Sequence, residues 1–378
     1  MKSLEEICIF IRNGLNIKND KSKKGIPLTR IETISNGIID INKTGYADIF
    51  NEKYSDYYLR KDDILMSHIN SLKHLGKVGY CYYDMKIIHG MNLLNIRVNP
   101  NNVYPKYLYY YFKSNNFKIK LNKISKQSVN QSSFSISDLK KIRIDIINLK
   151  RQKLMTTKLD KVVEFISIRK KQIEELNNLI KSQFVEMFGN GNYPKIQLKE
   201  VLNQKQQAEK VENTKLERFI TVGINGKGAR ERIIKDEKWP VPFVGYRVKG
   251  GQFIYSRIDA RNGAFAIIPN YLNNAVVSKD FPIFDIDYNK IKPDILLFSL
   301  LEESFIDIIK NSSFGATNRQ RIKEGTFLNY KIYLPPITIQ NEFSEIVKQI
   351  DKQKFESMIQ LKMMEKIYNI INDRRRYV

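Results

Sequence analysis

Two long stretches of the chain carry apolar side chains at the three- and four-residue spacing of an amphipathic α-helix. In the first stretch, residues 151–189, the apolar stripe consists of Leu159, Val162, Ile166, Ile173, Leu176 and Ile180. In the second stretch, residues 338–378, it consists of Val347, Ile350, Leu361, Met364, Tyr368 and Ile371. Two matching stripes in one chain predict that the helices pack on each other as a coiled coil, although each helix could instead pack on its own domain.

The rest of the chain alternates short apolar runs with turn residues. Strands are predicted over residues 77–84, 263–269 and 329–335, and helices over residues 104–113 and 294–310. This mixture indicates an α+β fold. The predicted organisation is a globular domain (1–150), a long helix (151–189), a second globular domain (190–337) and a second long helix (338–378). Because the first helix leads to the second domain and the second helix must return, the helices are expected to be antiparallel.

The sequence contains an internal repeat, so that each half of the chain shows the same pattern. Residues 127–152 align with residues 315–340, so that Asn130, Ile144 and Gln152 match Asn318, Ile332 and Gln340 at a spacing of 188. Upstream, Ser67 matches Ser256 at a spacing of 189, which is half of the 378 residues. The anchors agree in order as well as in spacing, and this favours an internal duplication over chance similarity.

The amino-acid composition indicates what kind of partner the chain binds. Sixty-four Lys and Arg against 40 Asp and Glu give a formal charge of +24 and a pI near 9.7, which predicts a polyanionic partner. A nucleic acid and an anionic membrane surface both fit this charge. No run is long and apolar enough for a spanning helix, and the first residues lack the apolar core of a signal peptide. We therefore expect a cytoplasmic protein without a membrane partner.

The motifs of catalytic and metal sites are missing from the sequence. Three His and two scattered Cys form no zinc motif, and GINGKG at residues 223–228 fits a turn better than a phosphate loop. Asp62 and Asp63 could hold Mg²⁺, but their repeat counterparts are Gly251 and Gln252, so we expect a solvated entry to a strand instead. We predict no catalytic residue and no metal site, although a nuclease site hidden in the variable loops would reverse this prediction.

Two segments carry a resemblance to a known family. YKIYLPPITIQNEFSEIVKQID, which starts at Tyr330, combines a strand, a Pro pair, a Gln and a helix, and SFGATNRQRI at residues 313–322 is a Gly-small-Thr loop before it. In the first copy, Ile147 and Asn148 replace the Pro pair. With two domains that are each followed by a long helix, the whole chain resembles the DNA-specificity subunits of type I restriction-modification systems.

The resemblance implies a division of labour between subunits. Two copies of a methyltransferase subunit would bind the helices, and an endonuclease and translocase subunit would complete the restriction complex. S-adenosylmethionine, ATP and Mg²⁺ would belong to these partners, and this chain would hold no cofactor. The chain would bind double-stranded DNA at a split site, each domain reading a few base pairs and the helices setting the unread gap. Adenine methylation would follow in the partner.

The duplication separates two kinds of DNA contact. Residues shared by both halves should belong to the framework or touch phosphates, whereas residues that differ should read bases. Asn130 and Asn318 are shared, and Arg319 and Arg321 are not; Arg pairs with guanine and Gln with adenine. The full set of DNA-contact candidates is Lys43, Asn70, Lys73, His74, Lys126, Gln127, Asn130 and Gln131 in the first half, and Lys227, Arg230, Arg232, Arg257, Arg261, Asn318, Arg319, Gln320 and Arg321 in the second.

Two alternatives remain open at the level of the sequence. Tyr80, Tyr82 and Tyr83, and the run 107–111, could stack on bases, but core packing is expected for them. The chain could also be a stand-alone DNA- or RNA-binding protein such as a repressor, and copurification with a methyltransferase would distinguish the two functions.

Overall fold

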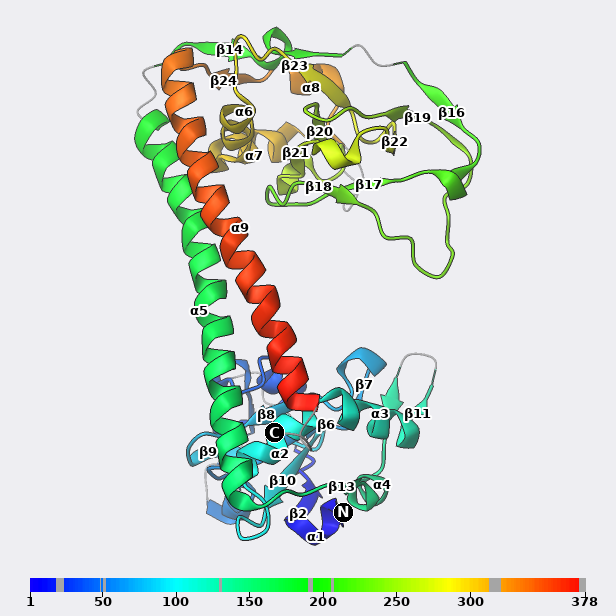
Figure 1. The fold of residues 1–378 in the computed structure, drawn as a ribbon, viewed down its shortest axis with the longest axis vertical. Coiled ribbons are helices and arrows are strands. Elements are labelled where there is room, and N and C mark those ends of the chain that lie inside the picture. Colours follow the sequence, from blue (N-terminus) through cyan, green and yellow to red (C-terminus); the bar gives the residue numbers. More distant parts are fainter. Residues whose placement is uncertain are drawn as a thin grey trace. The chain divides into compact units, whose positions relative to one another are not determined.

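The computed structural model describes residues 1–17, 24–47, 49, 52–128, 131–189, 193–204, 207–312 and 321–373. These residues form two compact units (Figure 1). Unit 1 consists of Met1–Lys170 and Met358–Val378, and unit 2 consists of Lys171–Ser357. The predicted domain boundaries follow the ends of the long helices and remain predictions, because the compact units divide the chain within these helices.

Unit 1 is built on a four-stranded antiparallel sheet in the order β2-β10-β6-β8. A second sheet has the order β4-β3-β9-β5, a third β11-β12-β7, and β1 pairs with β13. The strands are β1 (Lys2–Ser3), β2 (Cys8–Asn13), β3 (Ile26–Leu28), β4 (Gly45–Ala47), β5 (Tyr58–Leu59), β6 (Ile64–Ser67), β7 (Ile69–Asn70), β8 (Val78–Tyr80), β9 (Met85–Ile88), β10 (Leu93–Val98), β11 (Lys126–Gln127), β12 (Ser132–Ser133) and β13 (Arg143–Ile144).

Short helices cover the first sheet of unit 1, namely α1 (Leu4–Ile7), α2 (Pro105–Phe112), α3 (Asn115–Ile124) and α4 (Ile136–Lys141). Local sequence sets where they begin: Pro105 starts α2, and the Ser114 hydroxyl accepts the Phe117 N–H at the start of α3. The tyrosines of the run 107–111 are buried, as predicted, and fill the core between α2 and the sheet.

Unit 2 repeats this plan. Its four-stranded antiparallel sheet has the order β15-β23-β20-β21, and the smaller sheets are β16-β19-β22, β17-β18 and β14-β24. The strands are β14 (Lys195–Gln197), β15 (Leu202–Asn203), β16 (Glu209–Val211), β17 (Ile220–Val222), β18 (Ala229–Glu231), β19 (Phe243–Arg247), β20 (Phe253–Tyr255), β21 (Phe265–Ile267), β22 (Val276–Ser278), β23 (Ile283–Ile286) and β24 (Lys331–Tyr333); the short helices are α6 (Pro293–Leu301), α7 (Glu303–Ser312) and α8 (Glu324–Leu328).

The prediction of one helix over residues 294–310 is wrong, because α6 ends before Glu302 and α7 begins after it. Glu302 has extended backbone (φ −60°, ψ 142°), at the position that matches Ser114 between α2 and α3. The break turns α7 so that Phe305 and Ile309 are buried in the core of unit 2. Packing against the core therefore outweighs the helical propensity of a continuous apolar run.

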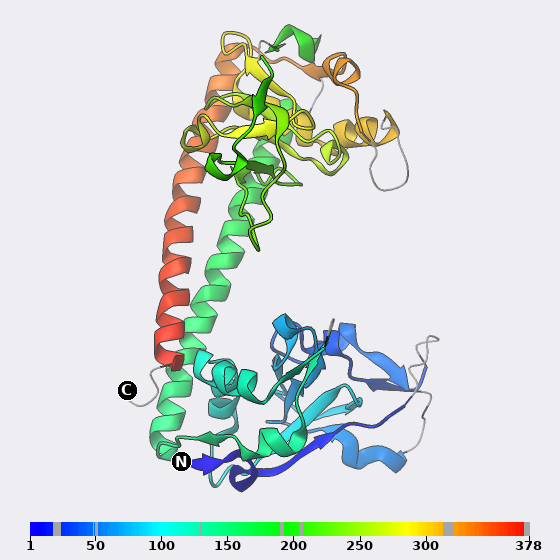
Figure 2. The same cartoon turned by 90° about the vertical axis from the view of Figure 1, so that its right-hand side faces the viewer.

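The two predicted long helices are present as α5 (Leu149–Phe188) and α9 (Ile337–Asp373). Both pass from one unit to the other, and within each unit their segments lie side by side and run in opposite directions, as both views show (Figures 1 and 2). In unit 1, Leu159 of α5 belongs to the core that Tyr368 and Ile371 of α9 contact. In unit 2, Leu176 and Ile180 share a core with Val347 and Ile350.

The remaining residues of the predicted apolar stripes, Val162, Ile166, Ile173, Leu361 and Met364, are half-buried. The predicted fold is confirmed, as α+β with each globular part followed by a long helix and the helices packed together.

Two buried glutamines show the duplication at atomic detail. Gln152 Oε1 accepts the Tyr104 N–H at 2.8 Å, and its Nε2 donates to the carbonyl of Ile147 at 2.6 Å. At matching positions, Gln340 accepts the Lys292 N–H and donates to the Pro335 carbonyl, both at 2.8 Å. In each unit, one amide thus connects the start of a long helix to the residue that precedes the proline of α2 or α6.

Candidate nucleic-acid interface

A small sheet in unit 1 brings together candidates that are distant in sequence. Gln127 of β11 lies opposite Ser132 of β12, which lies opposite Asn70 of β7. Residues directly opposite each other in neighbouring strands point to the same face, so the Gln127 and Asn70 amides share one face of this sheet. Gln127 is exposed and Asn70 half-buried. Asn70 also accepts the Ser71 N–H at 2.8 Å, which fixes the orientation of its side chain.

Four other candidates of the first group lie on these strands or next to them in sequence. Lys126 is exposed on β11, and Gln131 is exposed just before β12, where its carbonyl accepts the Ser128 N–H at 2.8 Å. Lys73 and His74 form the short 3₁₀ helix η4 (Leu72–His74), which directly follows β7. Lys43, at the end of η2 (Ile41–Lys43), lies 3.4 Å from Asp40 and is therefore partly neutralised.

In unit 2, the GINGKG segment is a turn between β17 and β18, as predicted. Asn225 and Gly226 in this turn donate their N–H groups to the carbonyls of Asn262 and Gly263 at 2.8 and 2.9 Å. These bonds hold the turn against η7 (Ala260–Asn262), which carries Arg261. Lys227 in the turn and Arg230 on β18 are exposed beside it.

Arg232 follows β18 and is also exposed; its N–H donates to the Phe219 carbonyl at 2.7 Å, which holds this end of the hairpin. Four cationic candidates of unit 2, Lys227, Arg230, Arg232 and Arg261, therefore come from the β17–β18 hairpin and the η7 turn bonded to it.

Two further arginines of unit 2 are ion-paired. Arg257 binds Glu324, and Arg321 lies 3.1 Å from Asp280. Glu324 is 67 residues from Arg257 in sequence, and Asp280 is 41 residues from Arg321, so no local pattern reveals either pair. A guanidinium that already binds a carboxylate must exchange that partner to read a base, which makes these two weaker candidates. The candidates Asn130, Asn318, Arg319 and Gln320 lie outside the described residues.

The prediction that Asp63 is solvated is wrong. Asp63 is completely buried, and its carboxylate accepts two hydrogen bonds from Arg97, both at 2.7 Å, and one from Asn95 at 3.1 Å. The hydrogen bonds to Asp63 raise the pKa of Arg97. In unit 2 the matching positions hold Gln252 and Asp285, joined by one hydrogen bond of 2.8 Å. Both pairs are structural, and the first explains Asp63, one of the two acidic residues that resembled a metal site.

Histidines and aromatic residues add no catalytic cluster. Within the described ranges, no group of three His, Cys, Asp or Glu side chains could hold a metal ion. His68 and His89 are buried, and burial lowers the pKa of both.

Tyr82 and Tyr83 are exposed, by 45% and 57%, so the expected core packing is wrong for these two and right for Tyr80. No helix in the described parts of the chain is long and apolar enough to cross a membrane.

Sequence reasoning missed three lysines of unit 1. Lys77, Lys113 and Lys118 line the same pocket as the candidate Lys73. Lys77 lies in the loop before β8, Lys113 just after α2 and Lys118 in α3, so only the fold brings them together. The repeat could have indicated two of them. Lys113 and Lys118 align with the apolar Leu301 and Ile306, and residues that differ between the halves are candidates for DNA contacts.

Comparison with known proteins identifies relatives of this architecture. A family model described as type I restriction modification DNA specificity domain matches residues 1–178 and again residues 180–363. The MjaX type I restriction enzyme specificity subunit of Methanocaldococcus jannaschii is 32% identical over 402 residues, which cover 98% of this chain and 92% of that protein. The EcoKI specificity subunit of Escherichia coli K12 is 22% identical over 193 residues, 49% of this chain and 41% of that protein.

Solved structures share the fold over nearly the whole chain. The S subunit of a type I restriction-modification system from M. genitalium has a TM-score of 0.54 at 16% identity, covering 98% of this chain and 94% of its own. A chain from a structure on complex assembly and conformational transition of the type I R-M system has a TM-score of 0.57 at 14% identity, covering 98% and 95%.

Proposed function

The chain belongs to the family of type I restriction-modification DNA specificity proteins, and we propose that each of its units reads one half of a split DNA site. As a specificity subunit it is not catalytic, and it recognises the DNA target of the system. In this family S-adenosylmethionine, ATP and Mg²⁺ belong to the methyltransferase and endonuclease subunits, in agreement with the predicted division of labour.

The observation that carries this proposal is that the two units share a fold but present different polar side chains on their surfaces. The four-stranded antiparallel sheets β2-β10-β6-β8 and β15-β23-β20-β21 correspond in strand order, and Gln152 and Gln340 make matching bonds. The polar groups on the surfaces differ: unit 1 presents the amides of Gln127 and Asn70, whereas unit 2 presents Lys227, Arg230 and Arg232. Amides pair with adenine and guanidiniums with guanine, so two half-sites of different sequence are expected.

The long helices are the proposed binding surface for partner subunits. In unit 1, α9 leaves Ile359, Met363, Ile367 and Ile370 exposed by 44%, 57%, 38% and 44%, and α5 leaves Phe165 and Ile168 exposed by 53% and 50%. Apolar side chains in a row on the surface mark an interaction site. We assign this surface to a methyltransferase subunit, with two copies in the complex, and an endonuclease subunit would join them. This surface favours a partner-dependent protein over a stand-alone repressor.

The same proposal places the protein in the cytoplasm, where the DNA is, and gives the helices the role of fixing the gap between half-sites. The chain would hold the duplex while a methyltransferase turns the target adenine out of the stack.

Coexpression with a type I methyltransferase subunit, followed by mapping of methylated adenines by long-read sequencing, tests the function. A split motif methylated only in the presence of this chain is the expected result. Replacing residues 1–150 by the corresponding domain of another family member should change one half-site and keep the other. Methylation without this chain, or a change in both half-sites, would contradict the proposal.

A further inference from the structure

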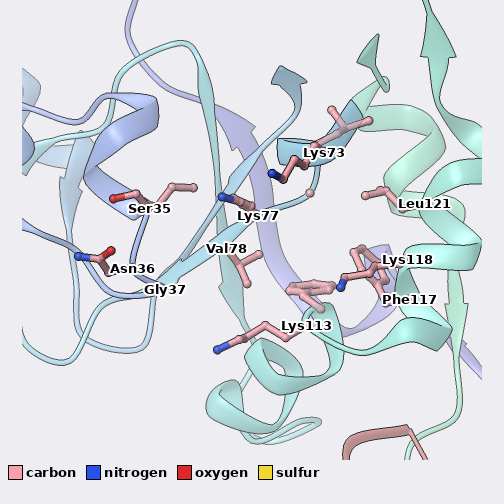
Figure 3. A pocket seen from close by; sticks show the side chains of 14 residues that line it. Ser35, Asn36, Gly37, Lys73, Lys77, Val78, Lys113, Phe117, Lys118 and Leu121 are labelled. Atoms are coloured by element: carbon pink, nitrogen blue, oxygen red, sulfur yellow. The ribbon is translucent and has the colours of Figure 1, made fainter. Parts of the chain in front are cut away.

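Four lysines of unit 1 surround one pocket. The pocket has a volume of about 370 Å³ and is lined by Lys73, Lys77, Lys113 and Lys118 together with Ser35 and Asn36. Figure 3 shows them on three sides: Ser35 and Asn36 after the 3₁₀ helix η1 (Ile31–Ile34), Lys73 and Lys77 on the segment before β8, and Lys113 and Lys118 at the junction of α2 and α3. None of the lining residues is an Asp or a Glu.

The described part of the chain supplies no carboxylate counter-ion to these lysines. Among the described residues, Lys73, Lys77, Lys113 and Lys118 form no ion pair with a carboxylate. Lys113 Nζ lies 3.2 Å from the hydroxyl of Tyr109 and 5.0 Å from the centre of its ring. Burial, and to a smaller extent the charge of Lys118, lowers the pKa of Lys113. A bound anion would offset both the burial and the repulsion from Lys118, because a nearby negative charge favours the protonated amine of Lys113.

A glycine keeps the pocket open beside Lys113. Gly37 has φ +81°, and its carbonyl accepts the Tyr109 hydroxyl at 2.9 Å. A Cβ at this position would lie 3.0 Å from that hydroxyl and 3.7 Å from Lys113 Nζ. Glycine therefore both permits the left-handed backbone and leaves the ammonium group accessible.

The repeat shows that the pocket belongs to the fold, whereas the lysines at the junction of α2 and α3 belong to unit 1. Unit 2 has a pocket of about 350 Å³ whose lining includes Asn225, Leu301 and Ile306, the counterparts of Gly37, Lys113 and Lys118 at a spacing of 188. That lining also carries Lys181, Arg261 and Lys310, so it is basic as well, and Lys310 is 2.9 Å from Asp307. One hollow is thus present in both units, and it is rich in unpaired lysines in unit 1.

We propose that the lysine pocket of unit 1 binds a phosphate group of the DNA backbone. This inference rests on the proposed function. The phosphate is assigned to DNA rather than to a free nucleotide because Lys73 lies three residues after Asn70, so the pocket continues from the proposed reading sheet β11-β12-β7. A duplex read at Gln127 and Asn70 would pass its backbone beside η4. The pocket anchors the first half-site, and unit 2 has the apolar Leu301 and Ile306 in place of Lys113 and Lys118.

The test combines lysine footprinting with salt-dependent binding of the full chain. Acetylation of each lysine is followed by mass spectrometry for the free protein, with a saturating DNA duplex at low salt, and with inorganic pyrophosphate. Duplex affinity is measured by fluorescence anisotropy over a range of salt concentrations. The variants are the double substitution Lys73→Gln with Lys118→Gln, at two exposed positions, and Lys113→Met, which retains the packing of the side-chain stem. The control, Lys170→Gln with Lys171→Gln, removes the same charge from α5.

The duplex is expected to protect the four lysines, and the double variant should make the logarithmic salt slope shallower by about 0.9, the contribution of one phosphate, while the control keeps the original slope. Lys113→Met should give the same change of slope with unchanged thermal stability.

Three outcomes contradict the proposal. If the duplex binds while the four lysines stay reactive and the slopes stay unchanged, the pocket assignment fails and the proposed DNA reading stands. Protection by pyrophosphate alone would assign the pocket to a free phosphate compound. A wild-type chain that binds no duplex at low salt would overturn both proposals.

Discussion

At the residue scale, the buried pair of Asp63 and Arg97 has a large predicted effect on stability. Asp63 is completely buried and the Arg97 side chain is 17% exposed, so neither charge has much water to replace its partner. Removal of one member of a buried ion pair typically costs about 3–5 kcal/mol, because the remaining charge is left unpaired.

Unit 2 supplies a substitution that tests this pair. Asp63→Gln should lower the free energy of unfolding by about 3 kcal/mol. Adding Arg97→Asp recreates the pair of Gln252 and Asp285, whose amide and carboxylate are 2.8 Å apart in unit 2, and should restore at least about 1 kcal/mol. Urea unfolding of both single variants and the double variant gives the coupling energy. Additive losses would show that the two positions act independently.

Two buried histidines make the stability of unit 1 depend on pH. Burial lowers the pKa of His68 and His89 in the folded protein, so both are neutral there. The unfolded chain binds protons more readily below its histidine pKa of about 6.5, so stability present above that pH is lost as the pH falls. The melting temperature should decrease from pH 7 to pH 5.5, and His89→Phe should weaken this decrease. His74→Gln, at a half-exposed position, is the control, and an equal effect of both variants would contradict the assignment.

The sequence did not reveal these pairings. Asp63 lies just before β6 and Arg97 on β10, while Asp280 and Arg321 lie outside the named strands. A side chain that finds its partner through the fold cannot be paired from local pattern. The same reason hid Lys77, Lys113 and Lys118. Charge alone identified the candidates Lys227, Arg230 and Arg232, whose placement in one hairpin depends on the turn bonded to η7.

At the element scale, α5 is held by its apolar stripe. Leu159 is fully buried in the core of unit 1, whereas Leu154 on the same helix is 57% exposed. Leu159→Ala should lower the free energy of unfolding by about 3 kcal/mol, because a cavity replaces the side chain. Leu154→Ala should change it by less than about 0.5 kcal/mol. Chemical denaturation monitored by circular dichroism measures both, and similar losses would place the two leucines in equivalent environments.

Helices were predicted better than strands for a physical reason. Apolar residues at helical spacing over some forty positions are compatible only with a long amphipathic helix, and α5 and α9 are such helices. Strands of two to six residues, such as β7 and β12, carry too few alternating positions to be recognised. The break at Glu302 was missed because the residues on both sides are good helix formers, and only the core decides where α7 must turn.

At the scale of the whole molecule, the charge of +24 determines how DNA binding responds to salt. Each contacted phosphate contributes about 0.9 to the slope of log affinity against log salt, so six contacts would weaken binding about 10³-fold between 50 and 200 mM salt. Anisotropy titrations with one duplex measure the slope. An affinity that hardly depends on salt would contradict phosphate contacts as the main source of binding.

The duplication was recognised from sequence because its anchors lie in the framework. Ile144 and Ile332 are both buried, and Gln152 and Gln340 are fixed by the same hydrogen bonds. Framework positions keep their chemistry while surfaces diverge, which is why the same comparison could suggest, but not place, the residues that read DNA.

The two buried pairs also restrict how such genes can recombine. A crossover that joined the first part of one unit to the second part of the other, between the paired positions, would place Asp63 beside Asp285 or Gln252 beside Arg97. The first hybrid buries two carboxylates together, and the second leaves a guanidinium without its counter-charge. Exchange of whole units keeps each pair intact, so new specificities should arise by shuffling complete domains.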